Sequence, residues 1–238
     1  MEVKVIGSGG MLNECNSSSF IIDGNTAIDM PNGFCKALYR MNLDPVSIEN
    51  VLITHLHGDH YFDIPFYIIA KNKFFDKKVK MYVPKGADKK IKKLIELAHF
   101  SIALDFFKKK TKLQLITDLN FKINSYKVER VLLSHSKQMK SFGFLFDSGS
   151  TVVGFSGDTA MCDNLDYMLG KCSYIFIDCA LVNGNAKHLG IDNITDLSTK
   201  YPNCKFALTH LSTESRKELQ KIKIDNVTIL NDGDVINI

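Results

Sequence analysis

Four side chains of the kinds that bind metal ions stand close together in the segment Thr54-His55-Leu56-His57-Gly58-Asp59-His60. In an extended backbone, residues two apart point the same way, so His55 and His57 can bind one ion together. Asp59 and His60 follow Gly58, which lets the backbone turn, and they can reach a second ion nearby. Imidazole and carboxylate ligands suit zinc, with manganese or iron as alternatives.

A lone histidine is more often a surface residue than a ligand. Three histidines and an aspartate within six residues, directly after the apolar run Val51-Leu52-Ile53, favour a metal site instead. Six residues cannot complete it, because structural zinc needs four protein ligands and catalytic zinc about three plus a water.

Further ligands are expected at the ends of other strands, where α/β proteins build their sites. His135, Asp158 and His210 each follow an apolar run. Taken singly, His135 or His210 is equally well explained as a core or surface histidine. The repeated pattern of an apolar run followed by a ligand favours a metal site.

These segments resemble the metallo-β-lactamase superfamily and, within it, the ribonuclease Z-like branch. The resemblance covers the whole chain, from Ile6-Gly7-Ser8-Gly9-Gly10 and Asp29 to Asn231-Asp232-Gly233-Asp234. It rests on His55-Leu56-His57-Gly58-Asp59-His60 with its extension Tyr61-Phe62-Asp63-Ile64-Pro65, on Ser156-Gly157-Asp158-Thr159, and on Leu208-Thr209-His210-Leu211-Ser212.

The resemblance implies an α/β fold, a four-layer αβ/βα sandwich, that holds two divalent metal ions, with zinc expected. The implied ligands are His55, His57 and His135 for the first ion, Asp59, His60 and His210 for the second, and Asp158 as a bridge. A water between the ions would attack the substrate, with Asp59 as its proton acceptor. The resemblance also suggests a homodimer.

His188 bears on the substrate class. Ribonuclease Z-like proteins have a further histidine that donates to the phosphate in the transition state and helps the leaving oxygen depart. His188-Leu189-Gly190 matches its position but lacks the Ser-Thr that follows it in that family, and Asp178 could orient the histidine. The alternative is that His188 caps a helix or lies on the surface.

The chain departs from the tRNA-processing enzymes in one large respect. Those enzymes insert a long arm between the third metal histidine and the bridging aspartate. Here twenty-two residues separate His135 from Asp158, and the expected strands Phe142–Phe146 and Thr151–Phe155 account for them. Ala160 also stands where those relatives tend to have arginine. Processing of tRNA 3′ ends is therefore disfavoured.

The leading hypothesis is a phosphodiesterase that acts on RNA ends or on a small diester such as a cyclic nucleotide. Hydrolysis of a carboxylic ester, thioester or lactone is the alternative, since related superfamily members use the same ligands. A non-catalytic metal-binding module is disfavoured, because the seven-ligand set leaves a position open for water.

The elements that must position these residues alternate between strands and helices. Strands are predicted at Val3–Ile6, Ser18–Ile22, Thr26–Asp29, Val51–Thr54, Phe121–Val128, Val131–Ser134, Phe142–Phe146, Thr151–Phe155, Tyr174–Asp178, Phe206–Thr209, Val227–Leu230 and Val235–Ile238. Helices are predicted at Gly33–Met41, Tyr61–Asn72, Ala87–His99, Asp192–Lys200 and Glu214–Lys221. The pattern predicts one α/β domain spanning residues 1–238.

Charge, hydropathy and cysteine content bear on the partners and the location of the protein. The net charge is +4, but Lys71–Lys112 holds fourteen lysines against four acidic residues. This segment is either a solvated helical face or a surface for RNA or another phosphate-rich partner. The absence of an eighteen-residue apolar run predicts no membrane span, and the six scattered cysteines with no visible signal peptide predict a cytoplasmic protein.

Overall fold

The computed structural model describes residues 1–74, 78–108 and 113–238, which form two compact units. The first unit comprises Met1–Gly7, Asn16–Thr117 and Gly233–Ile238, and the second comprises Ser8–Cys15 and Asp118–Asp232. Within these described ranges, each unit has one seven-stranded sheet. The single domain expected from the sequence stays a prediction.

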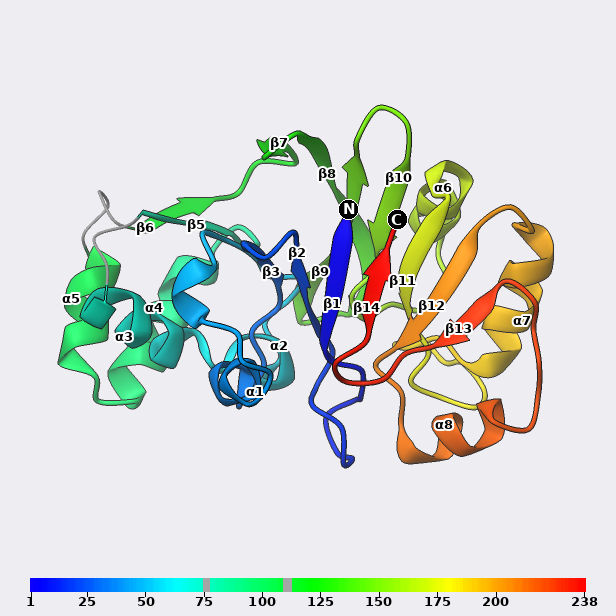
Figure 1. Ribbon diagram of the computed structural model, residues 1–238, viewed down its shortest axis with the longest axis horizontal. Helices are drawn as coiled ribbons and strands as arrows, with labels where there is room; N and C mark the ends of the chain where they lie inside the picture. The colour runs from blue at the N-terminus through cyan, green and yellow to red at the C-terminus, as the bar shows by residue number, and fades with distance from the viewer. Residues whose placement is uncertain (75–77, 109–112) are drawn as a thin grey trace. The chain divides into compact units, whose positions relative to one another are not determined.

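The sheet of the first unit joins both ends of the chain. Its strands are β1 (Glu2–Gly7), β2 (Ser19–Ile22), β3 (Thr26–Ile28), β4 (Asn50–Leu52), β5 (Val79–Tyr82), β6 (Leu113–Ile116) and β14 (Val235–Asn237), in the order β14-β1-β2-β3-β4-β5-β6. The red β14 runs antiparallel beside the blue β1 (Figure 1). From β3 to β6 the strands are parallel, so their carboxyl ends share one edge.

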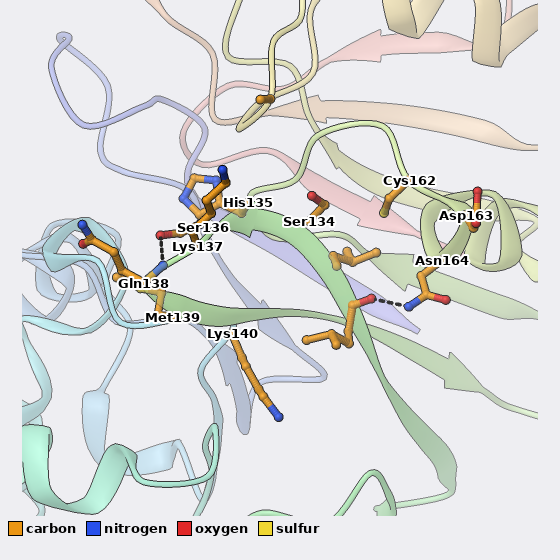
Figure 2. Close-up of a pocket in the computed structure, with 13 residues that line it drawn as sticks. Ser134, His135, Ser136, Lys137, Gln138, Met139, Lys140, Cys162, Asp163 and Asn164 are labelled. Carbon is orange, nitrogen blue, oxygen red and sulfur yellow. Dashed lines mark hydrogen bonds between the residues drawn. The ribbon is translucent and has the colours of Figure 1, made fainter.

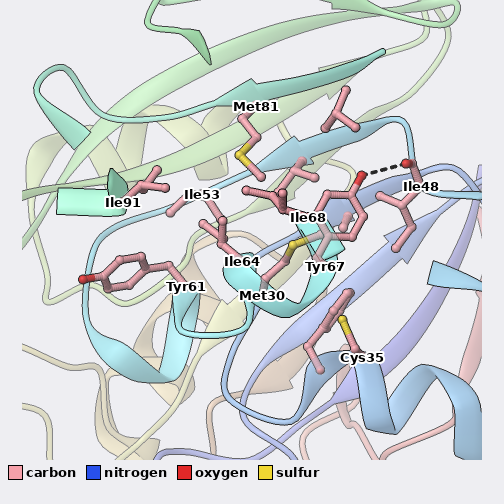
Figure 3. Close-up of a cluster of buried hydrophobic side chains, with 14 of the residues drawn as sticks. Met30, Cys35, Ile48, Ile53, Tyr61, Ile64, Tyr67, Ile68, Met81 and Ile91 are labelled. Carbon is pink, nitrogen blue, oxygen red and sulfur yellow. Dashed lines mark hydrogen bonds between the residues drawn. The ribbon is translucent and has the colours of Figure 1, made fainter. Parts of the chain in front are cut away.

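Helices cover this sheet and close its core. They are α1 (Phe34–Arg40), α2 (Gly58–Tyr61), α3 (Ile64–Phe74), α4 (Ala87–Leu97) and α5 (Ser101–Lys108), with a 3-10 turn at Pro45–Ser47. Figure 3 shows Ile53 and Met81 from the sheet side against Ile64 and Ile68 of α3. The Tyr67 hydroxyl, buried among them, donates to the Ile48 carbonyl at 2.8 Å.

The predicted helix Tyr61–Asn72 is wrong at its start, because the helical backbone is interrupted between the end of α2 and the start of α3. Asp63 lies in the break, and its carboxylate accepts hydrogen bonds from the backbone N–H groups of Gly33 and Cys35 at 3.0 and 2.7 Å. These donors belong to the first turn of α1, where no preceding carbonyl can satisfy them. Pro65 fits the first turn of the new helix, where no N–H is needed.

The sheet of the second unit contains a long antiparallel hairpin followed by parallel strands. Its strands are β7 (Asn120–Ile123), β8 (Tyr126–Ser136), β9 (Met139–Asp147), β10 (Val152–Phe155), β11 (Tyr174–Asp178), β12 (Lys205–Thr209) and β13 (Val227–Ile229), in reverse numerical order across the sheet. The predicted strand Phe121–Val128 is wrong: a turn at Asn124, whose φ is +51°, divides it between β7 and β8. Asparagine adopts this left-handed conformation more readily than most residues.

Three helices pack their apolar faces on this second sheet: α6 (Asp163–Lys171), α7 (Ile191–Lys200) and α8 (Thr213–Leu219). Only residues 148–151 join β9 to β10, as expected for a chain without an arm. Residues 75–77 and 109–112 of the Lys71–Lys112 segment lie outside the described residues. None of the described helices is long and apolar enough to cross a membrane.

Candidate metal centre

The four candidate ligands of the first unit lie where β4 leads into α2. His57 is the extended residue immediately before α2 (φ −78°, ψ 150°), and the helix begins at Gly58. The Nε2 atom of His55 and the Nδ1 atom of His57 approach to 3.0 Å. Two ring nitrogens that converge in this way can share a cation when both present lone pairs.

Thr54 determines which nitrogen His55 offers. Its hydroxyl donates to the Asp29 carboxylate at 2.7 Å, so it can only accept from the Nδ1 atom of His55, 3.0 Å away. His55 therefore carries its proton on Nδ1, and the lone pair of Nε2 faces His57.

Asp29 holds the other side of this set. Its carboxylate accepts from the Thr54 backbone N–H at 2.8 Å and from Nδ1 of His60 at 2.7 Å, so Nε2 of His60 is the ligand nitrogen. That atom lies 3.7 Å from Oδ2 of Asp59. Burial raises the pKa of Asp29, while the charge of His60 and these hydrogen bonds oppose the shift.

From the sequence, Asp29 was expected to matter only through its place in the resemblance. The sequence did contain a signal for a role of Asp29 in the site. Asp29 directly follows the apolar strand β3, just as the candidate ligands follow other strands. Its φ of +60° turns the backbone out of the sheet at this point. The sequence could not predict which residues the Asp29 carboxylate contacts.

Asp158 is the centre of the set in the second unit. It follows β10, and its Oδ2 lies 3.8 Å from Nε2 of His135 on β8 and 3.5 Å from Nε2 of His210 after β12. Candidate ligand atoms of Asp158, His188 and His210 all lie within 4.8 Å of one another. One carboxylate thus faces histidines from three segments far apart in the sequence.

His135 has the protonation state that a metal ligand needs. Its Nδ1 donates to the Lys187 carbonyl at 2.8 Å, which leaves the lone pair on Nε2. Burial lowers the pKa of His135 and outweighs the attraction of the Asp158 carboxylate. A neutral imidazole fixed in one tautomer by an outer hydrogen bond is the usual form of a ligating histidine.

His188 has the opposite tendency. Its Nδ1 lies 3.0 Å from Oδ2 of Asp178, which is fully buried at the end of β11. Burial lowers the pKa of His188, but the hydrogen bond and charge of Asp178 outweigh it, so the pKa lies above the ordinary 6.5. The ring stacks against that of His210, with centroids 5.2 Å apart. His188 is therefore the member of this set best suited to carry a proton.

A glycine turn lies against the last candidate ligand. Gly9 forms a bridge with Leu211, and Gly10 donates its N–H to the Leu211 carbonyl at 2.9 Å. A Cβ on Gly10 would meet the His210 carbonyl at 3.3 Å, so this approach favours glycine. The Gly7-Ser8-Gly9-Gly10 segment thus supports a ligand segment instead of opening a dinucleotide-binding helix.

The seven predicted ligands fall into two groups. The structure brings His55, His57, Asp59 and His60 together in the first unit, and it brings His135, Asp158 and His210 together with His188 in the second. Outer oxygens hold the Nδ1 atoms of His55, His60 and His135, so their Nε2 atoms are free to converge with the carboxylates, whereas His57 turns its Nδ1 atom toward His55. Neutral imidazoles with one or two carboxylates fit a divalent transition metal such as zinc.

A family model matches residues 1–236, and its description is Anti-Pycsar protein Apyc1. The chain belongs to the Anti-Pycsar protein Apyc1 family. This match covers both units and every candidate ligand.

Curated relatives of this Apyc1-family chain include several ribonucleases Z. That of Latilactobacillus sakei is 26% identical over 101 residues, which are 41% of this chain and 32% of the relative. That of Pyrococcus abyssi is 28% identical over 152 residues, which are 61% of this chain and 48% of the relative. The chain thus spans between a third and a half of the length of these relatives.

Solved structures confirm the expected fold class. The metallo-β-lactamase fold protein YhfI of Bacillus subtilis has a TM-score of 0.79 at 18% identity, covering 99% of this chain and 98% of that one. The short form of human tRNase Z scores 0.75 at 20% identity, covering 100% and 99%. A diphosphatase of the PhnP family scores 0.76 at 16% identity, covering 100% and 97%. The chain therefore has the α/β metallo-β-lactamase fold.

Proposed function

We propose that this chain is a dinuclear metal-dependent phosphodiesterase that hydrolyses small nucleotide diesters, cyclic nucleotides among them. The first ion would be held by His55, His57 and His135, the second by Asp59, His60 and His210, with Asp158 shared between them. Two such ions, when bound, lower the pKa of a water and neutralise charge on the phosphoryl group. Zinc is the expected metal, with manganese or iron as alternatives.

The observation that carries this proposal is the pair formed by His188 and Asp178 beside Asp158. His188 is not among the proposed ligands, and the hydrogen bond and charge of Asp178 favour the protonated ring. Such a group can donate to a phosphoryl oxygen or protonate a departing alkoxide. Asp59 would accept the proton of the attacking water. A carboxylic ester with a good leaving group has less need of this acid.

The small-substrate assignment rests on the β9–β10 connection and on the family. Four residues, 148–151, stand where a tRNA-processing arm would have to be inserted, so RNA ends are the less favoured substrate. The Apyc1 family is associated with cyclic nucleotide degradation, and the similarity in fold to a diphosphatase of the PhnP family supports a phosphate-containing substrate. A cytoplasmic homodimer is the proposed working form.

A substrate panel tests the proposal directly. Purified protein loaded separately with Zn²⁺, Mn²⁺ or Fe²⁺ would be assayed on bis-p-nitrophenyl phosphate, the four 3′,5′-cyclic mononucleotides, a thioester and a lactone. We expect hydrolysis of the diesters and little turnover of the other two, with the Asp158→Ala variant inactive as a control. Turnover of the thioester or lactone alone would instead establish the ester-hydrolase alternative.

A further inference from the structure

A groove of about 830 Å³ lies beside His135 on the second unit. The turn between β8 and β9 forms one side of it, and the segment that starts α6 forms another (Figure 2). Small-molecule sites usually have volumes of about 300–1,000 Å³, so the groove has room for a nucleotide-sized ligand. Apart from His135, none of its lining residues has a part in the proposed metal centre.

The lining combines apolar and hydrogen-bonding surface. Leu132, 44% exposed, and Met139 supply apolar contact. The exposed side chains of Gln138 and Asn164 supply amides, and Asn164 already uses its amino group on the Leu132 carbonyl at 2.7 Å. The Gln138 carboxamide offers both a donor and an acceptor, as the edge of a nucleobase requires.

The charge in the groove also suits a nucleotide. Lys137 and Lys140 both line it, against a single carboxylate from Asp163. All three are exposed, so their effect on a phosphate is steering and weak attraction instead of a fixed contact. The Ser136 hydroxyl accepts from the Gln138 backbone N–H at 3.2 Å, which shapes the turn that presents Gln138 (Figure 2).

We propose that this groove binds the nucleoside part of the substrate, with the base against Leu132 and Met139 and its polar edge at Gln138. The assignment rests on the proposed function, since it takes the phosphodiester to lie at His135. It makes the β8–β9 turn the element that distinguishes a nucleotide from a diester that has no base. The metal centre then supplies the chemistry, and the turn selects the substrate.

The test compares two kinds of substrate on the same variants. In Gln138→Ala/Lys140→Ala, KM for the preferred cyclic mononucleotide should rise about 5- to 10-fold, the range expected for lost hydrogen bonds. The kcat should hold, and KM for bis-p-nitrophenyl phosphate should rise by no more than about 2-fold, because that substrate loses only the weak attraction of Lys140 for its phosphate. Lys205→Ala, an exposed lysine on β12 of the same unit, serves as the matched control and should leave both values unchanged.

Two results would overturn the groove assignment while leaving a phosphodiesterase. One is an unchanged nucleotide KM in the double variant. The other is wild-type protein that cleaves bis-p-nitrophenyl phosphate but no cyclic mononucleotide.

If no diester is cleaved, the proposed function fails. A nucleoside-binding experiment then tests the groove assignment separately. Adenosine and uridine, which carry no phosphate, should shift the backbone amide resonances of Gln138 and Met139 in the wild type and not in the double variant. Absence of those shifts would overturn the assignment.

Discussion

Apart from His57, whose Nδ1 atom faces His55, the clustered histidines turn their Nδ1 atoms toward oxygen atoms of the protein. His60 pairs with Asp29, His135 with the Lys187 carbonyl, and His188 with Asp178. Nδ1 of His210 also lies near Asp178, 3.6 Å from its Oδ1. Such outer partners fix the tautomer and the ring orientation before a metal binds, which reduces the entropy lost on binding.

The residues of these clusters were readable from the sequence, and so was Asp178 as the partner of His188, while the outer partners of His60 and His135 were not. The H-x-H-x-D-H segment places its ligands by local geometry, and His135, Asp158 and His210 repeat the pattern of a strand followed by a ligand. The partners depend on contacts between segments far apart in the chain. Asp29 and Thr54 are twenty-five residues apart, and His135 and Lys187 are fifty-two apart.

Replacing His188 should separate chemistry from metal binding. In His188→Ala, both metal equivalents should remain, while kcat falls by about 10²–10³, or about 3–4 kcal/mol. The loss should be larger on a nucleotide diester than on a nitrophenyl diester, because an alkoxide needs a proton to depart and nitrophenolate does not. Metal analysis and steady-state kinetics on both substrates measure this. Equal turnover by variant and wild type on both would remove His188 from the mechanism.

The pH profile should report the Asp178 charge through His188. Asp178 raises the pKa of His188, so its carboxylate extends the pH range over which the acid stays protonated, and activity falls as pH rises through that pKa. In Asp178→Asn the charge is lost, and the alkaline limb of kcat against pH should move to lower pH. The His188→Ala profile should lack this limb. An alkaline limb at the same pH in Asp178→Asn and wild type would contradict the pairing.

Asp29 should act on metal affinity. Asp29→Asn keeps the side-chain shape and tolerates the left-handed backbone, but it removes the charge that His60 faces. We expect metal affinity to fall by about 10- to 100-fold, measured by competition with a chromophoric chelator. Asp23→Asn is the matched control, since Asp23 also has a positive φ of 46° but lies in an exposed turn. Equal affinities in the two variants would show that Asp29 does not support the site.

At the scale of helices and strands, the element bounds predicted from the sequence were most accurate where apolar runs are bounded by turns. Tyr174–Asp178 is β11 to the residue, and the predicted strands Ser18–Ile22 and Thr26–Asp29 match the antiparallel β2 and β3 to within one residue at each end. Besides the 3-10 turn at Pro45–Ser47, four described elements were missed: β5, β6, α5 and α6. β5 and β6 are four-residue strands with polar residues inside them, and their positions are set by parallel pairing with β4 and with each other. Such pairing leaves no local signal in the sequence.

Asp63, between α2 and α3, stabilises the start of α1, and this effect can be measured. Asp63→Ala removes the acceptor for two N–H groups of the first turn of α1, one of them buried. The free energy of unfolding should fall by about 1–2 kcal/mol, as for the loss of a helix cap. Asp63→Asn, which keeps one acceptor oxygen, should lose less. Urea denaturation compares them with Asp44→Ala, which removes an exposed local cap. An Asp63→Ala free energy of unfolding equal to that of the wild type would contradict the capping role.

At the scale of the whole molecule, charge is unevenly distributed. The exposed lysines Lys89, Lys90, Lys92 and Lys93 lie on α4 in the first unit. An apolar stripe of this helix, with Ile91 and Ile95, faces the core, so the lysines occupy the solvent side as an amphipathic helix requires. These four lysines therefore fit the interpretation as a solvated helical face, whereas Lys71 is buried and donates to the Val46 carbonyl at 2.6 Å. The chain also holds few arginines, whose planar fork suits phosphate better than lysine does.

These features together predict poor processing of precursor tRNA. A large RNA needs contacts beyond the scissile phosphate, and residues 148–151 are too few to supply them as an arm. At equal enzyme concentration, kcat/KM for 3′-end cleavage of a precursor tRNA should lie well below that for the best cyclic mononucleotide. An arm-bearing ribonuclease Z in the same assay provides the control for the RNA. If the chain instead cleaved precursor tRNA efficiently, the exposed α4 lysines would be the replacement surface. Its affinity would then fall steeply with salt and fall again in a variant with those four lysines changed to alanine.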